Sequence, residues 1–375
     1  MVSGARPDVD NTVGSGRGGI IATRSRGGHF PITEIQALMD SLLRWCSEHV
    51  APEAGSELGL EMVSGDASFR RYYRLVGCSL SRIAVHAPPD KERNLEFTRI
   101  AELLRAAGVH APEVLAFEPN QGFLLLEDLG DRLLRPALDE ASVEQLYGAA
   151  LETLLAIQQA PTSGAGWELA DYGRPLLEQE MRLFPEWFLR GLLGIPPTAA
   201  ETALIDGLFS LLATEALAQP QVLVHRDYHS RNLMLLDAGE LGVIDFQDAV
   251  RGPVTYDLVS LLRDCYVSWP PERVEAWALG YAARAVDAGI MAPMPADRFL
   301  RCFDLMGLQR HIKVLGIFAR LWLRDGKAGY LRDLPLVIHY TLSVAQRHPD
   351  TRDFADWFRE RVLPLASRQD WFSAA

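Results

Sequence analysis

The spacing of apolar positions divides the chain into a short region of strands and a longer region of helices. Helical spacing runs over about 33–50 and again over 92–107, where Gly108 ends the pattern. Five short runs are typical of strands: 58–63, 69–76, 82–87, 113–117 and 122–127. Beyond Asp128 the spacing is mainly helical to the C-terminus, interrupted by one short β segment.

This order of elements predicts an α+β protein with two lobes. The strands and one helix form a small N-lobe over 31–127, and the helices form a larger, mainly helical C-lobe over 128–375. Residues 1–30 are rich in Gly, Arg and Ser and have no hydrophobic periodicity, so they predict a disordered tail.

Composition narrows the class of protein. The 375 residues carry a formal charge of −12, which argues against a surface dedicated to nucleic acid or anionic lipid. No apolar run approaches the ~20 residues that span a bilayer. The four cysteines are scattered and form no zinc motif or disulfide framework, which favours a reducing compartment. We therefore expect a cytoplasmic protein that binds neither nucleic acid nor membrane; its protein partners stay open.

The most informative stretch is a short hairpin pattern. Two apolar runs, 233–236 and 241–244, flank Asp-Ala-Gly-Glu, which is typical of a turn. If the turn has four residues, Leu236 faces Leu241. Counting back along both strands then places Asn232 opposite Asp245, with Asp227 one short loop upstream.

An amide and two carboxylates at one end of a hairpin suit a particular chemistry. Oxygen ligands of this kind bind Mg²⁺, which takes few protein ligands and keeps several waters. Phosphoryl transfer uses such a set, with one carboxylate accepting the hydroxyl proton and Asn and Asp holding metal on the phosphates. The alternative is that Asp227 and Asn232 only satisfy turn backbone groups, as Asp and Asn commonly do.

The same residues carry a family resemblance. His225-x-Asp227-x4-Asn232, followed by Asp245-Phe246, resembles the catalytic and metal-binding loops of kinase-like phosphotransferases, and 252–258 resembles the aminoglycoside phosphotransferase branch. The resemblance implies a bilobal protein-kinase-like fold that uses ATP and Mg²⁺. It also implies that Asp227 is the catalytic base, that Asn232 and Asp245 bind Mg²⁺, and that Asp257 and His225 support the catalytic loop.

A closer resemblance lies in four other stretches: 65–74, 87–89, 246–253 and 308–318. These are similar to the N-acetylmuramate/N-acetylglucosamine kinases. That resemblance implies phosphorylation of the anomeric C1 hydroxyl of the amino sugar, in a route of peptidoglycan recycling. The residues by themselves indicate only phosphoryl transfer.

The nucleotide side departs from the superfamily pattern. The loop 65–69 is positioned to fold over ATP phosphates, with Ser68 as a contact, although it is equally read as a plain hairpin turn. The lysine expected on the third strand is missing, since the chain contains only three lysines. Arg71 or Arg74 on the preceding strand is the favoured replacement, because Arg donors suit phosphate oxygens.

Two further features belong to this side. Lys91, paired with Glu96, is an alternative source of positive charge. The segment that ends the last strand is where a hinge would present backbone groups to adenine, chiefly at Glu127 and Leu129.

The acceptor side is assigned to a long helix predicted over 301–324. Gln309 and Lys313 share a face with Arg320, and we expect Gln309 and Lys313, with Arg310 as a third candidate, to meet the sugar or its lactyl carboxylate. The alternative is a solvated polar face. Other possible sugar contacts are Glu180, Arg182, Trp187 and 266–269.

Two rival functions are open. One is the same chemistry on another small alcohol, such as choline, homoserine or an antibiotic. The other is an inactive nucleotide-binding module, which the missing lysine favours and the Asp227, Asn232 and Asp245 set disfavours.

Overall fold

The structure is a computed structural model that describes residues 32–64, 69–164 and 166–372. The predicted tail at 1–30 and the predicted phosphate contact Ser68 lie outside these residues. The described residues divide between two units, with 32–41 in the first and those from 42 onward in the second. The first helix, α1 (Ile32–Ser47), begins in the first unit.

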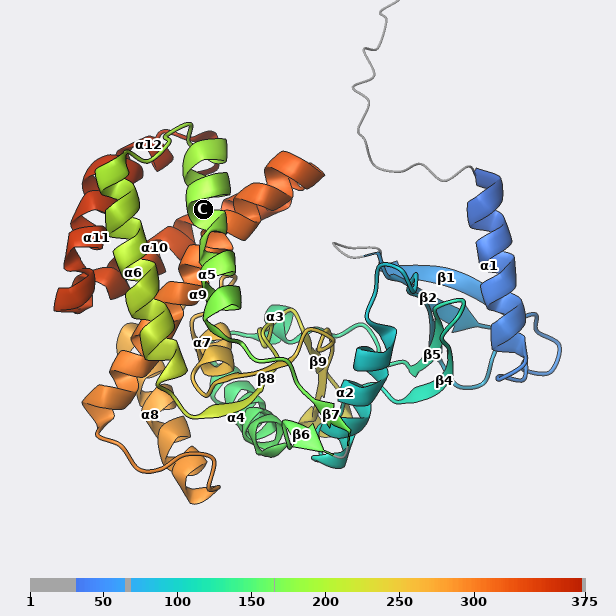
Figure 1. The fold of residues 1–375 in the computed structure, drawn as a ribbon. Helices are drawn as coiled ribbons and strands as arrows, with labels where there is room; N and C mark the ends of the chain where they lie inside the picture. The colour runs from blue at the N-terminus through green and yellow to red at the C-terminus, as the bar shows by residue number, and fades with distance from the viewer. Residues whose placement is uncertain (1–31, 65–68, 165, 373–375) are drawn as a thin grey trace, which may run out of the picture. The chain divides into compact units, whose positions relative to one another are not determined.

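A five-stranded antiparallel sheet forms the first part of the second unit (Figure 1). Its strand order is β1-β2-β3-β5-β4. The strands are β1 (Gly59–Ser64), β2 (Arg71–Val76), β3 (Arg82–His86), β4 (Val114–Glu118) and β5 (Phe123–Glu127). Helix α2 (Asn94–Ala106) connects β3 to β4 and buries Phe97, Ile100 and Leu104, the apolar side of its helical pattern.

The remainder is mostly helical. The helices are α3 (Leu134–Ala137), α4 (Val143–Gln159), α5 (Arg174–Met181), α6 (Ala199–Leu217), α7 (Tyr256–Leu262), α8 (Pro271–Asp287), α9 (Ala296–Asp325), α10 (Leu334–Arg347), α11 (Arg352–Trp357) and α12 (Leu363–Ala366). Two π-helical segments are η1 (Phe184–Leu192) and η5 (Phe358–Val362). Short 3-10 segments are η2 (Asp237–Gly239), η3 (Ala328–Asp333), η4 (Pro349–Thr351) and η6 (Asp370–Phe372).

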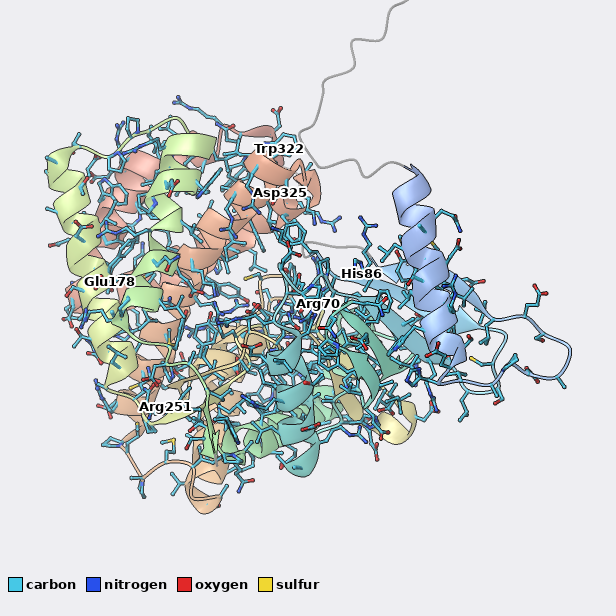
Figure 2. The ribbon with its side chains drawn as sticks, turned by 45° about the vertical axis from the view of Figure 1, so that its right-hand side comes forward. Arg70, His86, Glu178, Arg251, Trp322 and Asp325 are labelled. Carbon is cyan, nitrogen blue, oxygen red and sulfur yellow. The ribbon has the colours of Figure 1, made fainter. Side chains whose placement is uncertain are left out.

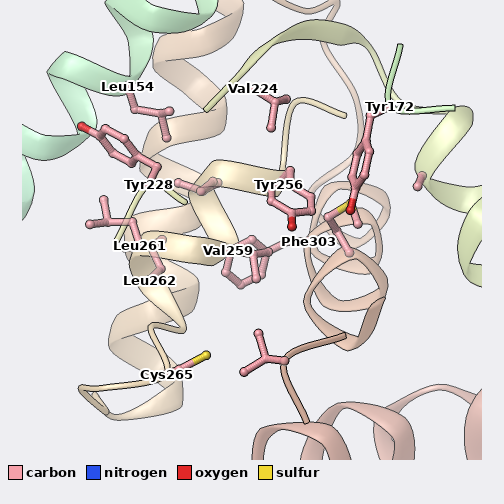
Figure 3. Packing of buried hydrophobic residues seen from close by; sticks show 14 of the residues in the cluster. Leu154, Tyr172, Val224, Tyr228, Tyr256, Val259, Leu261, Leu262, Cys265 and Phe303 are labelled. Carbon is pink, nitrogen blue, oxygen red and sulfur yellow. The ribbon is translucent and has the colours of Figure 1, made fainter. Parts of the chain in front are cut away.

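Three small two-stranded ribbons lie among the helices. They are β6 (Ser163–Gly164) with β7 (Trp167–Glu168), β8 (Gln221–Val224) with β11 (Val250–Pro253), and β9 (Leu233–Leu235) with β10 (Leu241–Val243). The β8–β11 and β9–β10 ribbons hold the segments on either side of the catalytic-loop motif. Side chains from α4, β8 and α7 pack together beneath them, including Leu154, Val224 and Leu261 (Figure 3).

Helix α9 is the central support of the helical part. Its 30 residues cover the predicted helix at 301–324 and are buried over most of their length. Close packing is tightest at Gly316, where an added Cβ would lie 2.3 Å from the main-chain carbon of Leu183. A buried helix surrounded by other helices can carry polar side chains only if they find internal partners.

The predicted register of the β9–β10 hairpin is wrong by one residue. Leu241 pairs with Leu235, and the Leu236 N–H donates to the Glu240 carbonyl, so the turn has three residues and Gly239 takes φ 83°. A three-residue turn with a left-handed glycine explains the shift. Asn232 therefore lies opposite Ile244, whose N–H donates to the Asn232 carbonyl at 3.1 Å.

The predicted fold class is confirmed, with an antiparallel sheet followed by a mainly helical region. The boundary between lobes after residue 127 stays a prediction. Among the described residues, no helix is both long enough and apolar enough to cross a membrane.

Candidate active site

The loop that follows β8 is held in shape by a buried carboxylate on α7. Asp257 accepts hydrogen bonds from the main-chain N–H groups of His225 at 2.6 Å and Arg226 at 3.0 Å. Arg226 has φ 76°, a left-handed conformation that a non-glycine residue adopts only at a cost. The two hydrogen bonds offset that cost and turn the chain so that Asp227 follows directly. Burial raises the pKa of Asp257 to about 7, against the effect of the two N–H donors.

The His225 ring adds a second support by contacting the main chain that follows β10. Its Nε2 lies 3.0 Å from the Ile244 carbonyl, and its Nδ1 lies 3.3 Å from the Asp227 N–H. These partners fit a neutral ring that donates through Nε2 and accepts through Nδ1. Burial lowers the pKa of His225, which is consistent with that neutral form.

Asn232 connects Asp227 to Asp245 through its side-chain amide. Its Nδ2 donates to the Asp227 main-chain carbonyl at 3.0 Å and to Asp245 Oδ2 at 3.3 Å. Asp245 reaches Asn232 although the strand register places it one position further along, because Asp245 has φ 66° and the chain turns there. Gln247 Nε2 also donates to Asp245 Oδ1, at 2.7 Å. The three polar residues predicted from the sequence are therefore gathered together.

The donor set fits a magnesium ion. Asp245 is exposed and offers carboxylate oxygens, and the Asn232 Oδ1 has no hydrogen-bond donor among the described residues. Two oxygen donors are few for a cation held by protein alone but suit Mg²⁺, which completes its shell with water and substrate phosphates. The described residues contain no group of three or more His, Cys, Asp or Glu that could hold a metal.

The carboxylate of Asp227 lies in a positive environment. Burial alone would raise its pKa, but Lys313, His229 and Arg310 lower it below the usual range. No hydrogen bond from a described side chain or main-chain group reaches the carboxylate oxygens of Asp227. An ionised carboxylate with accessible lone pairs is what a general base requires.

A network of buried ion pairs lies beside this loop. Glu180 on α5 binds Lys313 at 3.0 Å and also contacts Arg226 and the Tyr172 hydroxyl. Lys313 donates to the Tyr256 hydroxyl at 3.0 Å. The rings of Tyr172 and Tyr256 meet edge to face with centroids 5.2 Å apart (Figure 3).

The polar face of α9 is thus buried, and its interpretation as a solvated face is wrong. Gln309 is fully enclosed and donates to the Tyr172 hydroxyl at 3.3 Å, while Arg310 Nη1 lies 3.2 Å from Cys265 Sγ. Arg320 does not join the network. Helical periodicity shows that polar residues share a face, but only the packing of α5, η1 and α7 shows that this face points inward.

The three arginines around β2 have different partners. Arg74 binds Asp128 at 2.6 Å and Asp131 at 2.9 Å, so its guanidinium is already engaged by two carboxylates of the segment after β5. Arg71 is half-buried and forms no ion pair among the described residues. Lys91 is exposed and pairs with Asp90, not with Glu96 as expected.

Arg70 is a residue that sequence reasoning did not select (Figure 2). Its side chain is 3% exposed, pairs with Glu92 at 3.2 Å and donates to Gln247 Oε1 at 3.1 Å. Because Gln247 also binds Asp245, Arg70 links the sheet to the residue at the end of β10. Alternation along the strand distinguishes the faces of β2 but gives no sign of which arginine finds a buried glutamate.

The segment at Glu127 and Leu129 borders a cavity of about 430 Å³ that is also lined by His110, Leu235 and Leu236. The Glu127 N–H donates to the Glu113 carbonyl, and the Glu127 carboxylate accepts from Arg105 Nη1 at 3.2 Å and lies 2.9 Å from His110 Nε2. The Leu129 N–H has no partner among the described residues. The Glu127 side chain therefore connects the end of β5 to α2 and to the segment between α2 and β4.

Comparison with known proteins shows which family the chain belongs to. A family model described as the phosphotransferase enzyme family matches residues 59–294. The chain belongs to this family. Two relatives in Pseudomonas aeruginosa and Pseudomonas putida, each named N-acetylmuramate/N-acetylglucosamine kinase, are both 43% identical to it. The first alignment covers 78% of this chain and 86% of the relative, and the second covers 80% and 88%.

A solved structure extends the comparison to the fold. An ethanolamine kinase of Plasmodium vivax matches 85% of this chain and 96% of its own, with a TM-score of 0.60 and 12% sequence identity. The predicted protein-kinase-like fold is therefore confirmed. The present chain, as a member of this family, is a phosphotransferase with an alcohol group as acceptor, as its sequence predicted.

Proposed function

We propose that this phosphotransferase is an ATP-dependent kinase of amino sugars that phosphorylates the C1 hydroxyl of N-acetylmuramate and N-acetylglucosamine. The observation that carries the proposal is the convergence of Asp227, Asn232 and Asp245 on one end of the β9–β10 hairpin. The proposed substrate rests on two relatives that are N-acetylmuramate/N-acetylglucosamine kinases and are 43% identical over most of both chains. The product would be a sugar 1-phosphate of use in peptidoglycan recycling.

In this mechanism Asp227 accepts the proton of the attacking hydroxyl. Asp257 and His225 hold the loop so that the Asp227 carboxylate faces the acceptor, and the cations nearby keep it ionised. Asn232 and Asp245 would hold Mg²⁺, which neutralises charge on the transferring phosphoryl group. The buried Glu180–Lys313 pair is too deep to bind a phosphate directly and instead maintains the positive environment.

On the nucleotide side we propose backbone contacts from Glu127 and Leu129 to the adenine base. The Leu129 N–H, which has no partner among the described residues, supports its part in this, since adenine offers ring acceptors to such a donor. Arg71 is favoured over Arg74 as the phosphate contact, because the guanidinium of Arg74 is already occupied by Asp128 and Asp131. Ser68 stays a prediction.

On the acceptor side the three residues predicted on α9 divide into two groups. Gln309 and Lys313 have partners inside the protein, and we propose that they hold the residues around the acceptor site in place. Arg310 is 4% exposed and its only described hydrogen bond goes to a sulfur, a weak acceptor. We propose that Arg310 stabilises negative charge close to Asp227.

One experiment tests substrate and position together. Purified protein is incubated with ATP, Mg²⁺ and each amino sugar, and the product is examined by ³¹P and ¹H NMR. A phosphate coupled to the anomeric proton is expected with both sugars. Phosphate at another carbon would overturn the regiochemistry, and turnover of choline, homoserine or an aminoglycoside without turnover of either amino sugar would overturn the substrate. No phosphoryl transfer to any of these acceptors, with nucleotide still bound, would favour the inactive module.

A further inference from the structure

Arg231 lies inside the catalytic loop, between the proposed base and the proposed metal ligand Asn232, and no role above uses it. We infer that Arg231 is the residue that recognises the carboxylate of an acidic acceptor sugar and so separates N-acetylmuramate from the neutral N-acetylglucosamine. This inference rests on the proposed function. It assigns a specificity-determining contact to that same site.

The position of Arg231 is fixed by a buried carboxylate on the far side of the loop. Asp264 accepts hydrogen bonds from the Ser230 N–H at 3.0 Å and the Tyr266 N–H at 3.1 Å. One carboxylate therefore binds the residue before Arg231 to the segment that carries Tyr266. Asp264 is fully buried, so the two segments are held together firmly.

Tyr266 connects Arg231 to the reacting end of the site. The Tyr266 ring meets the His229 ring edge to face, with centroids 5.4 Å apart. The His229 N–H in turn donates to the main-chain carbonyl of Asp227 at 3.0 Å. The Arg231 guanidinium carbon lies 3.5 Å from the centre of the Tyr266 ring, on its face. Stacking on an aromatic face restricts the motion of a guanidinium. Its N–H donors point outward in the plane of the guanidinium, so they stay free to bind a ligand.

The charge of Arg231 is only weakly compensated. Its nearest carboxylate is Asp333, at 3.7 Å, which is too long for a hydrogen bond. The side chain is 33% exposed, and its guanidinium forms no hydrogen bond with any described residue. Planar guanidinium donors match a carboxylate in a bidentate geometry, so a carboxylate ligand would complete this site.

The other cations beside Asp227 differ from Arg231 in this respect. Lys313 and Arg226 are both bound to Glu180, and Arg310 is almost completely enclosed beside Cys265. A carboxylate that reached any of these side chains would have to displace a buried partner or enter the core, at a large desolvation cost. Arg231 is half-buried at the edge of the loop and needs no such rearrangement.

The consequence is a difference between two substrates. N-acetylmuramate carries a lactyl carboxylate that N-acetylglucosamine lacks, and a charge-assisted bidentate contact of this kind changes affinity by roughly 10- to 100-fold. Arg231→Gln is therefore expected to lower kcat/KM for N-acetylmuramate by roughly that factor. The same change should alter kcat/KM for N-acetylglucosamine by less than about threefold.

The test measures kcat/KM for N-acetylmuramate, its methyl ester and N-acetylglucosamine in wild type, Arg231→Gln, Arg231→Lys and Arg332→Gln. Arg332 is the matched control, because it also lies near Asp333, at 4.0 Å, but is 67% exposed. Arg231→Gln should use the acid and the ester equally, Arg231→Lys should recover part of the loss, and Arg332→Gln should behave as wild type.

Three outcomes would overturn the inference: an equal loss for all three sugars, which indicates a general role in the loop; no loss for any sugar; or the same selective loss in Arg332→Gln. A wild type that phosphorylates only N-acetylglucosamine would also overturn it while leaving sugar phosphorylation intact. A wild type that phosphorylates none of these sugars but does phosphorylate another alcohol would instead show that the proposed function has failed.

Discussion

The loop 225–232 and strand β2 use charged residues in opposite ways. Along the loop, the buried carboxylates of Asp257 and Asp264 accept hydrogen bonds from main-chain N–H groups, so that side chains determine the path of the backbone. Along β2, the backbone is set by the sheet, and the partners of the arginines depend on distant segments: Glu92 for Arg70, and Asp128 with Asp131 for Arg74. The family motif reports part of the first arrangement, because it includes Asp257 at a fixed separation of 32 residues from His225. It cannot report the second.

The sharpest test of the loop is the loss of its central carboxylate. Asp227→Ala should lower kcat by roughly 10²- to 10⁴-fold, the usual contribution of a general base. Nucleotide affinity should change little, because the groups proposed to bind ATP lie on the sheet and the segment after β5. Steady-state kinetics and calorimetric titration with a nonhydrolysable ATP analogue measure the two quantities.

Asp356→Ala is the control for that variant, since Asp356 lies exposed on α11 and pairs with Arg359. It should keep wild-type kinetics. Activity close to wild type in Asp227→Ala would show that another group accepts the proton.

Removal of the loop brace gives the next largest effect. Asp257→Ala leaves the buried N–H groups of His225 and Arg226 without an acceptor, which should lower the free energy of unfolding by about 2–4 kcal/mol. Denaturant unfolding followed by tryptophan fluorescence checks this. Asp171→Ala removes an exposed carboxylate paired with Arg251 and should cost less than about 1 kcal/mol. Equal losses in the two variants would mean that Asp257 braces nothing.

Strand β2 allows a direct comparison of two arginines. Arg71→Gln should raise the KM for ATP by about 10-fold, the effect of one lost charge-assisted contact to phosphate. Arg74→Gln should leave that KM nearly unchanged and instead lower stability by about 1 kcal/mol, because it breaks the pairs with Asp128 and Asp131. If Arg74→Gln raised the KM and Arg71→Gln did not, the assignment along β2 would be reversed.

The sequence was sufficient for features that depend on local spacing. The strands, α2 and the long helix followed from periodicity, and the gathering of Asp227, Asn232 and Asp245 followed from turn chemistry near a hairpin. Even there the predicted register of the hairpin was wrong by one residue, because the same stretch of residues can form either a three-residue or a four-residue turn. Asp245 still reaches Asn232 only through its left-handed backbone, which no pattern predicts.

Features that depend on distant partners could not be predicted. The burial of Lys313 and Gln309 depends on Glu180 and Tyr172, which lie more than a hundred residues earlier on α5 and the segment before it. A lone lysine on a helix face has the same appearance in a sequence whether its face is solvated or enclosed. The choice among Arg70, Arg71 and Arg74 likewise depends on which acidic residues the fold brings near each one.

A dependence of stability on pH distinguishes the helical region from the sheet. His311 is buried on α9, where burial and the neighbouring Arg310 lower its pKa to about 3. The folded protein keeps His311 neutral, whereas the unfolded chain takes up a proton below pH ~6.5. Its contribution is therefore fully present above pH ~6.5 and is lost as pH falls, at up to about 1.4 kcal/mol per pH unit.

His311→Phe should keep the stacking on Tyr340 and remove this titration. Between pH 7 and pH 5 the unfolding free energy of wild type should fall by about 2 kcal/mol more than that of the variant, measured by urea denaturation at each pH. His339→Phe, at a neighbouring histidine ring beside Tyr340 that lies outside the network, serves as the control and should keep the wild-type slope. Parallel pH profiles for wild type and His311→Phe would show that the enclosed face of α9 does not hold this ring neutral.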